Sequence, residues 1–184
     1  MPVQLPYVLG ADLAGVGHVA VQLAKQAGAY VIATAREYNH EFVRQLGADE
    51  VIDYTTTDFT KAISSPVDIV LDMVIDKTAT VLDPTIGETG RKSYKVLKDG
   101  GKLLSLVSMA INEYPKIRGI EAQFVHAEPN HNDFVAILRN IHEQKLKVHL
   151  SGIFPFTSQG LAEAYCKCET NPKRGKIVIQ RKNG

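Results

Sequence analysis

The N-terminal part of the chain contains a strand, a glycine-rich turn, a helix and a second strand in succession, and this unit constrains the fold most. The run "YVLG" (7–10) is a candidate first strand, and "YVIATA" (30–35) is typical of a buried strand. Between them, "GVGHVAVQLAKQAG" (15–28) has apolar residues at helical spacing and ends at a glycine. Strands joined by helices of about ten residues predict an α/β fold with a parallel sheet covered on both faces.

The same alternation continues toward the C-terminus. The expected helices are "HEFVRQLGAD", "TTDFTKAI", "RKSYKVL" and "NDFVAILRNIHEQK", and the expected strands are "EVIDY", "VDIVLDMV", "KLLSLVS" and "EAQFVHA". A turn at Gly100–Gly101 is expected before the "KLLSLVS" strand. The stretch 75–90 is polar, punctuated by Gly and Pro and long for a connection, so we expect it to be functional or mobile.

Composition excludes several classes of function. The chain has 184 residues, 45% hydrophobic and 22% charged, which is ordinary for one globular domain with a substantial core. A formal net charge of +1 gives no electrostatic case for binding nucleic acid or an anionic membrane. The N-terminus lacks the features of a signal peptide, and no apolar stretch approaches the roughly 20 residues that span a bilayer. We therefore expect a cytoplasmic protein with no nucleic-acid or membrane partner.

The glycine turn is similar to the turn with which dinucleotide-binding proteins hold a pyrophosphate. Glycines there let backbone N–H groups approach the phosphates at the positive end of a helix dipole. Aligned on its last glycine, the G-x-G-x-x-G frame has Asp12 and Ala14 at the first two glycine positions and Gly17 at the third. The carboxylate of Asp12 would lie beside a pyrophosphate of like charge. The motif alone is weak, because a glycine turn that opens an apolar helix also occurs as a purely structural feature.

The end of the second strand bears on the choice of cofactor. In NAD sites an acid about 20 residues beyond the turn accepts hydrogen bonds from the ribose hydroxyls. Here the strand ends "ATAR" without an acid, and the guanidinium of Arg36 suits a 2′-phosphate through charge-assisted hydrogen bonds. Glu37 is the competing candidate for an NAD site, and a solvated loop arginine is the third interpretation. We predict NADP(H) rather than NAD(H).

Longer segments resemble the medium-chain dehydrogenase/reductase superfamily, in its zinc-free, NADP-dependent quinone oxidoreductase-like branch. The resemblance lies in "GVGHVAVQLAKQAGAYVIATA", "FVRQLGADEVIDYTTTDF", "VDIVLDMV", "SYKVLKDGGKLLSLVS" and "RGKIVIQ", which cover most of the chain from Gly15 to Gln180. It implies a Rossmann-type, doubly wound parallel sheet of six strands with helices on both faces. It also implies that NADPH is bound and that hydride is transferred to a quinone or an α,β-unsaturated carbonyl.

The resemblance further implies a set of cofactor contacts. The glycine turn would hold the pyrophosphate, and residues at and after the end of the second strand would bind the 2′-phosphate. A tyrosine would lie near the adenine, and residues after the fourth and fifth strands would approach the ribose and nicotinamide. In that order, the residues are Gly15, Val16 and Gly17; Thr34, Arg36 and Asn39; Tyr54; and Val74, Ser105, Leu106 and Val107. No catalytic group can be named, because nothing in the sequence places the titratable Tyr94, Lys95 or Tyr114 near the nicotinamide.

The resemblance is incomplete at the N-terminus. Members of this family begin with a separate barrel-like domain that forms the far wall of the substrate cleft, and we expect this chain to contain nearly none of it. Because "LPYVLGADLAGV" resembles part of that domain, Asp12 would come from a fusion of two similar stretches rather than from a phosphate-binding turn. The expected organisation is a remnant of that domain (1–14), an NADP-binding Rossmann domain (15–146) and a C-terminal strand–helix–strand tail (147–184).

No metal site is expected. Structural zinc in this superfamily requires four clustered cysteines, and catalytic zinc takes Cys and His ligands from the N-terminal domain. Cys166 and Cys168 are one residue apart and are expected to be free thiols on a helix. The histidines lack paired ligand spacing and are expected on the surface or on helix faces: His126, His131, His142 and His149.

The sequence leaves two main functions open. The first is an NADPH-dependent oxidoreductase of the quinone reductase or alkenal reductase type, acting on a small-molecule quinone or an enal or enone. The second is a truncated cofactor-binding module without turnover. Loss of one wall of the cleft removes substrate orientation and uncovers apolar surface, which favours a homo-oligomer. A nucleotide-sugar or methyl-donor Rossmann protein is a weaker third alternative, since the second strand lacks an acid at its tip.

Overall fold

The computed structural model describes residues 7–9, 15–73, 87–170 and 174–181. Strands and helices alternate along these residues, as the sequence predicts. The elements are, in order, β1 (Tyr7–Leu9), α1 (Gly17–Gln26), β2 (Val31–Thr34), η1 (Glu37–Asn39), α2 (His40–Gln45), β3 (Glu50–Ile52), α3 (Phe59–Ala62), β4 (Val67–Asp72), α4 (Glu88–Val96), β5 (Leu97–Ser105), η2 (Met109–Glu113), β6 (Glu121–Phe124), α5 (His131–His142), β7 (Leu150–Pro155), α6 (Ser158–Thr170) and β8 (Lys176–Gln180).

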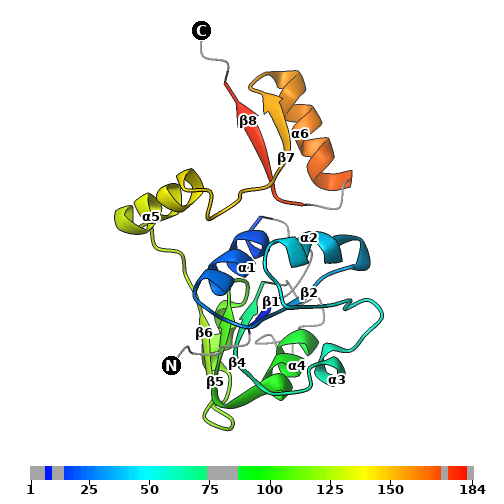
Figure 1. Cartoon of the computed structure of the whole chain (residues 1–184), viewed down its shortest axis with the longest axis vertical. Helices are drawn as coiled ribbons and strands as arrows, with labels where there is room; N and C mark the ends of the chain where they lie inside the picture. The colour runs from blue at the N-terminus through cyan, green and yellow to red at the C-terminus, as the bar shows by residue number, and fades with distance from the viewer. Residues whose placement is uncertain (1–6, 10–14, 74–86, 171–173, 182–184) are drawn as a thin grey trace.

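A six-stranded parallel sheet forms the body of the protein (Figure 1). Its strand order is β3-β2-β1-β4-β5-β6, and every neighbouring pair runs parallel. From the central pair β1 and β4, successive strands follow toward the two edges of the sheet, β2 and β3 on one side and β5 and β6 on the other. This is the doubly wound Rossmann arrangement. The predicted α/β fold class is confirmed, and the expected first strand pairs with both β2 and β4 at the centre of the sheet.

Helices cover both faces of this sheet because its strands are apolar on both sides. In β2, Val31 and Ala33 join a buried cluster with Val21 of α1 and Val43 of α2. The intervening Ile32 belongs to a second cluster with residues of β4, α4 and β5. Alternate side chains of a strand point to opposite faces, so the unbroken run of apolar residues in β2 requires cover on both.

The Gly100–Gly101 pair differs from the expected turn, because it lies inside β5. The pairing of β4 with β5 shifts between Val67 and Ile69, whose partners are Leu97 and Lys102. Gly100 has a φ of 73°, and its N–H donates to the carbonyl of Arg118 over 2.9 Å. The two glycines therefore lie at an irregularity in the pairing, where β5 advances by five residues while β4 advances by two.

The C-terminal residues form a layer of their own beyond α1 and α2 (Figure 1). It consists of the parallel pair β7–β8 with α6 packed against it. The division of the chain into domains at residues 14 and 146 stays a prediction. Within the described residues, no helix combines the length and apolar character that crossing a membrane requires.

Candidate functional site

The carboxyl ends of the parallel strands lie along one edge of the six-stranded sheet, and the predicted site residues follow these ends. Thr34 is the last residue of β2, and Ser105 is the last residue of β5. Tyr54 follows β3 after one intervening residue. In open α/β sheets ligands bind at this edge where the strand order reverses, here between β1 and β4.

The glycine turn opens α1 at this edge. Gly15 is buried with a φ of 80°, a left-handed conformation that favours glycine, and Gly17 begins the helix. Val16 between them is 47% exposed. A Cβ added to Gly15 would lie 2.6 Å from the Nζ atom of Lys176. The proposed effect of Asp12 on cofactor binding remains a prediction, because Asp12 lies outside the described residues.

The structure brings together two residues expected at the adenosine end. The Nε atom of Arg36 donates to the hydroxyl of Tyr54 over 3.0 Å. Glu37, the competing candidate, donates its backbone N–H to the carboxylate of Asp53 over 3.1 Å. Hydrogen bonds from the Thr55 side chain and then its backbone lower the pKa of Asp53. Asp53 is therefore stabilised as a carboxylate by hydrogen bonds within its own turn.

Asn39 is placed differently from Arg36 and Tyr54. Its side chain is 1% exposed, and its Oδ1 atom accepts from the Nε of Arg174 over 2.6 Å. Arg174 also donates to the carbonyl of Tyr38, and its guanidinium lies over the rings of Tyr38 and Phe42. Asn39 therefore anchors a residue of the C-terminal segment.

The loop after β5 is held by one buried serine. Ser105 is 0% exposed, and its hydroxyl donates to a carboxylate oxygen of Asp72 over 3.0 Å. The hydroxyl oxygen of Ser105 accepts the N–H groups of Val107 over 3.2 Å and Ser108 over 3.0 Å. The N–H of Leu106 donates to the carbonyl of Asp72. This network orders the backbone at the carboxyl edge. Val74, the site residue expected after β4, lies outside the described residues.

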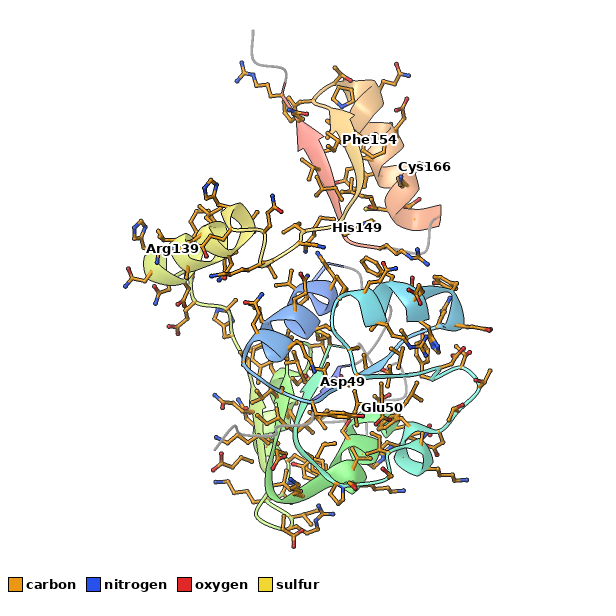
Figure 2. The ribbon with its side chains drawn as sticks, viewed as in Figure 1. Asp49, Glu50, Arg139, His149, Phe154 and Cys166 are labelled. Carbon is orange, nitrogen blue, oxygen red and sulfur yellow. The ribbon has the colours of Figure 1, made fainter. Side chains whose placement is uncertain are left out.

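Sequence reasoning missed a cluster of basic residues beside the glycine turn. His18 is 0% exposed, and its Nε2 atom accepts the N–H of His149 over 3.3 Å. Its Nδ1 atom is buried and has no hydrogen-bond partner within the described residues. Burial, together with Lys176 and His149, lowers the pKa of His18. Figure 2 shows His149 between the α1–α2 side of the sheet and the C-terminal layer.

Glutamine side chains on α1 hold the connection to this layer in place. The amide of Gln22 donates to the carbonyl of Lys147 over 2.9 Å and accepts from the N–H of Lys147 over 2.8 Å. Gln26 donates to the carbonyl of Lys145 over 2.7 Å. No periodic pattern signals these contacts, because they join segments more than a hundred residues apart in the sequence.

The titratable residues considered for catalysis lie elsewhere. Tyr94 and Lys95 are near the end of α4, which leads into the amino end of β5 and so away from the carboxyl edge. Tyr94 is buried against Tyr114, with ring centroids 4.8 Å apart, and burial raises its pKa. Neither Tyr94 nor Lys95 is placed to act at the carboxyl edge.

Within the described residues, no three His, Cys, Asp or Glu side chains lie in a group that could hold a metal ion. Both cysteines lie on α6, where Cys166 is exposed and Cys168 is half-buried. The four histidines expected on the surface are exposed: His126, His131, His142 and His149.

Comparison with known proteins shows that the chain is similar to oxidoreductases. Residues 46–179 match the family described as zinc-binding dehydrogenase. The chain is 29% identical over 177 residues to the trans-enoyl reductase pgmF of Aspergillus terreus, covering 90% of this chain and 49% of the relative. It is 32% identical over 169 residues to the chloroplastic NADPH-dependent alkenal/one oxidoreductase of Arabidopsis thaliana, covering 90% and 38%.

Among solved structures, the quinone oxidoreductase from Coxiella burnetii superposes with a TM-score of 0.78 at 31% identity. The match covers 96% of this chain and 52% of that one. The chain thus spans about half the length of several curated relatives it matches.

Proposed function

The chain belongs to the zinc-binding dehydrogenase family within the medium-chain dehydrogenases/reductases, and on that premise we propose that it is an NADPH-dependent oxidoreductase. The proposed reaction is hydride transfer from NADPH to a quinone or an α,β-unsaturated carbonyl. The relatives' names, which include quinone oxidoreductase, trans-enoyl reductase and NADPH-dependent alkenal/one oxidoreductase, support this substrate class. A cytoplasmic location and a homo-oligomeric state belong to the same proposal.

The observation that carries this proposal is the start of α1. The left-handed Gly15 has no side chain to cover the backbone of the turn, and the cationic end of Lys176 lies against it. His18 adds a buried ring whose Nε2 is an acceptor, so in the neutral ring Nδ1 is a donor that finds no partner among the described residues. Backbone N–H groups, a helix N-terminus and basic side chains are what a pyrophosphate requires. The residues therefore fit a dinucleotide.

Each part of the carboxyl edge has a role in this proposal. The backbone of Gly15, Val16 and Gly17 holds the pyrophosphate, and Thr34 and Arg36 face the adenosine side. Tyr54, which accepts a hydrogen bond from Arg36, keeps that guanidinium in place beside the adenine.

Beyond the adenosine side, the loop Ser105–Val107 positions the nicotinamide end, because the buried Ser105 hydroxyl ties it to β4. Bound NADPH supplies the hydride, and the chain's own residues orient it. The proton that completes reduction of a quinone comes from solvent.

A second candidate is a cofactor-binding module without turnover. It is supported by apolar side chains exposed on the C-terminal layer. Ile153 is 56% exposed, Phe156 65% and Tyr165 69%. NADPH oxidation in the presence of a quinone or an enal separates the two candidates.

The binding part of the proposal is tested with Arg36→Ala. Enhancement of the fluorescence of the reduced nicotinamide reports binding, because aromatic side chains do not absorb at the wavelength that excites it. Loss of a guanidinium–phosphate contact is expected to weaken NADPH about tenfold or more, with NADH changed less than about twofold. Arg44→Ala on α2 removes an exposed arginine elsewhere and serves as the control. Equal losses for the two nucleotides would remove Arg36 from the 2′-phosphate site.

A further inference from the structure

The helix α5 has an apolar face that no described part of the chain covers. Four large apolar side chains recur along one side of it at the helical spacing i, i+3, i+4 and i+7, and all are exposed: Phe134, Ile137, Leu138 and Ile141. We call these four residues the α5 stripe. No residue of α5 is buried, and no described helix or strand packs along it (Figure 1).

A helix as short as α5 normally depends on such cover. It has 12 residues, and isolated helices shorter than about 12–15 residues are only marginally stable in water. Helices in folded proteins draw most of their stability from packing an apolar face against other residues. Phe134 is 60% exposed and Leu138 49%, so α5 lacks this contribution within the described residues of one chain.

Both ends of α5 are nevertheless fixed. At its start, the side chain of Asn130 accepts the N–H of Asn132 over 2.9 Å. After its end, Leu146 is 2% exposed, and the carbonyl of Lys145 accepts a hydrogen bond from Gln26 of α1 over 2.7 Å. The stripe therefore lies on a helix that is already positioned, and a partner can bind it without first ordering that helix.

The charges on α5 make the stripe complementary to a second copy of itself in the antiparallel direction. The first turn carries an acid, Asp133, and the last turn carries Arg139 and His142. The stripe itself contains no charged residue. Beyond the helix, Lys145 is already paired with Glu143 over 2.7 Å. When two such helices lie antiparallel, the acidic turn of each lies alongside the basic turn of the other, whereas a parallel pair would place like charges together.

We propose that the α5 stripe is the interface through which two copies of this chain associate, as an antiparallel pair of α5 helices related by a two-fold axis. The axis passes beside Ile137 and Leu138 at the middle of the stripe, so that Phe134 of each copy packs beside Ile141 of the other. This inference rests on the homo-oligomeric state in the proposed function and names the surface for it. It does not depend on the dinucleotide site, because α5 is tied to the last residue of α1 and the glycine turn lies at the start of that helix.

The contact between two α5 helices is small, so the dimer should be weak. Each helix contributes 12 residues, and interfaces at the low end of the size range are typical of transient complexes. We expect a dissociation constant on the order of 10 μM, so that the chain is mainly monomeric below about 1 μM.

Leu138 lies next to the two-fold axis and faces its own copy, which allows a charge-exchange experiment. Leu138→Glu and Leu138→Lys should each weaken self-association at least about a hundredfold, because two like charges would meet in the interface. An equimolar mixture of the two variants should associate again, since each carboxylate then meets an ammonium. Ile153→Glu, which changes an exposed apolar side chain on β7, is the matched control and should dimerise as the unchanged chain does. Sedimentation equilibrium compares the mass in solution with that of the 20.2 kDa monomer.

A second mixture tests the antiparallel direction. Phe134→Glu and Ile141→Lys should each associate poorly alone and should associate when mixed, because residue 134 of one copy lies beside residue 141 of the other. In a parallel pair each residue would meet its own equivalent, and the mixture would gain nothing.

The outcomes separate this inference from the function beneath it. If the unchanged chain stays monomeric at about 100 μM, or if Ile153→Glu abolishes the dimer and Leu138→Glu does not, the role of the α5 stripe is overturned and the dinucleotide site is not. A dimer that either mixture fails to restore would overturn the antiparallel pair. Leu138→Glu should bind NADPH as the unchanged chain does, so an unchanged chain that dimerises without binding NADPH overturns the proposed reaction alone. Thermal unfolding, at a concentration where the unchanged chain is monomeric, confirms that each variant is folded.

Discussion

Replacing Gly15 by alanine tests the phosphate-binding turn with a control that the chain itself provides. Gly15 and Gly28 lie at the two ends of α1 with nearly equal φ values of 80° and 82°. A Cβ on Gly28 would meet nothing within 4 Å, whereas one on Gly15 would lie 2.6 Å from the Nζ of Lys176. The two substitutions therefore impose the same backbone strain and differ only in what the methyl group meets.

The cost in stability follows from the conformation. An L-residue in the left-handed region costs about 1–2 kcal/mol, and the stiffer unfolded chain of an alanine variant returns about 0.4–1 kcal/mol. Each variant should therefore lose about 1 kcal/mol, which for a chain of this length lowers the melting temperature by roughly 2–4 °C. The contact with Lys176 adds little to this, because the end of a lysine side chain can move.

Binding should separate the two variants. In Gly15→Ala the methyl group occupies the space through which phosphates reach the backbone of the turn, so NADPH affinity should fall at least about tenfold. Gly28→Ala should bind NADPH as the unchanged chain does. Titration of NADPH fluorescence, with thermal unfolding in parallel, measures both effects. If Gly15→Ala binds NADPH within about twofold of Gly28→Ala, the turn does not hold the phosphates and the reasoning is refuted.

Two further predictions concern stability. Leu103→Ala removes a side chain that is 0% exposed in the core and should lower the free energy of unfolding by about 2–5 kcal/mol in urea titrations. Leu138→Ala, which changes a side chain that is 49% exposed on α5, should lower it by less than about 1 kcal/mol. A larger loss for Leu138→Ala than for Leu103→Ala would contradict the assigned core. Because the pKa of folded His18 lies below its ordinary value of 6.5, the unfolded chain binds the extra proton, so stability should be complete above pH 6.5 and fall as the pH drops below it. His18→Gln should reduce this dependence of stability on pH, whereas His142→Gln, which changes an exposed histidine, should not. Equal dependence on pH in the two variants would refute the assignment of the effect to His18.

Much of the fold was predictable from the sequence because its signals are local. The alternation of β-branched runs with amphipathic segments reflects hydrogen bonding and burial within about ten residues, and the strands and helices formed where this pattern predicts them. The resemblance to the family implied that Arg36 and Tyr54 both lie at the adenosine end of the cofactor, and the structure shows the two side chains hydrogen-bonded to each other. The irregular strand pairing at Gly100–Gly101 was less predictable, because a glycine pair signals a turn between elements or an irregularity within a strand equally well.

By itself, the sequence determined the strands, the helices, the class of sheet and the glycine turn, since each depends on residues close together along the chain. Only the tertiary structure decided what lies against that turn. The contact between Arg174 and Asn39 spans 135 residues, and the hydrogen bond between His18 and His149 spans 131. Such contacts depend on how a separate layer packs against α1, and that packing leaves no periodic trace in the sequence.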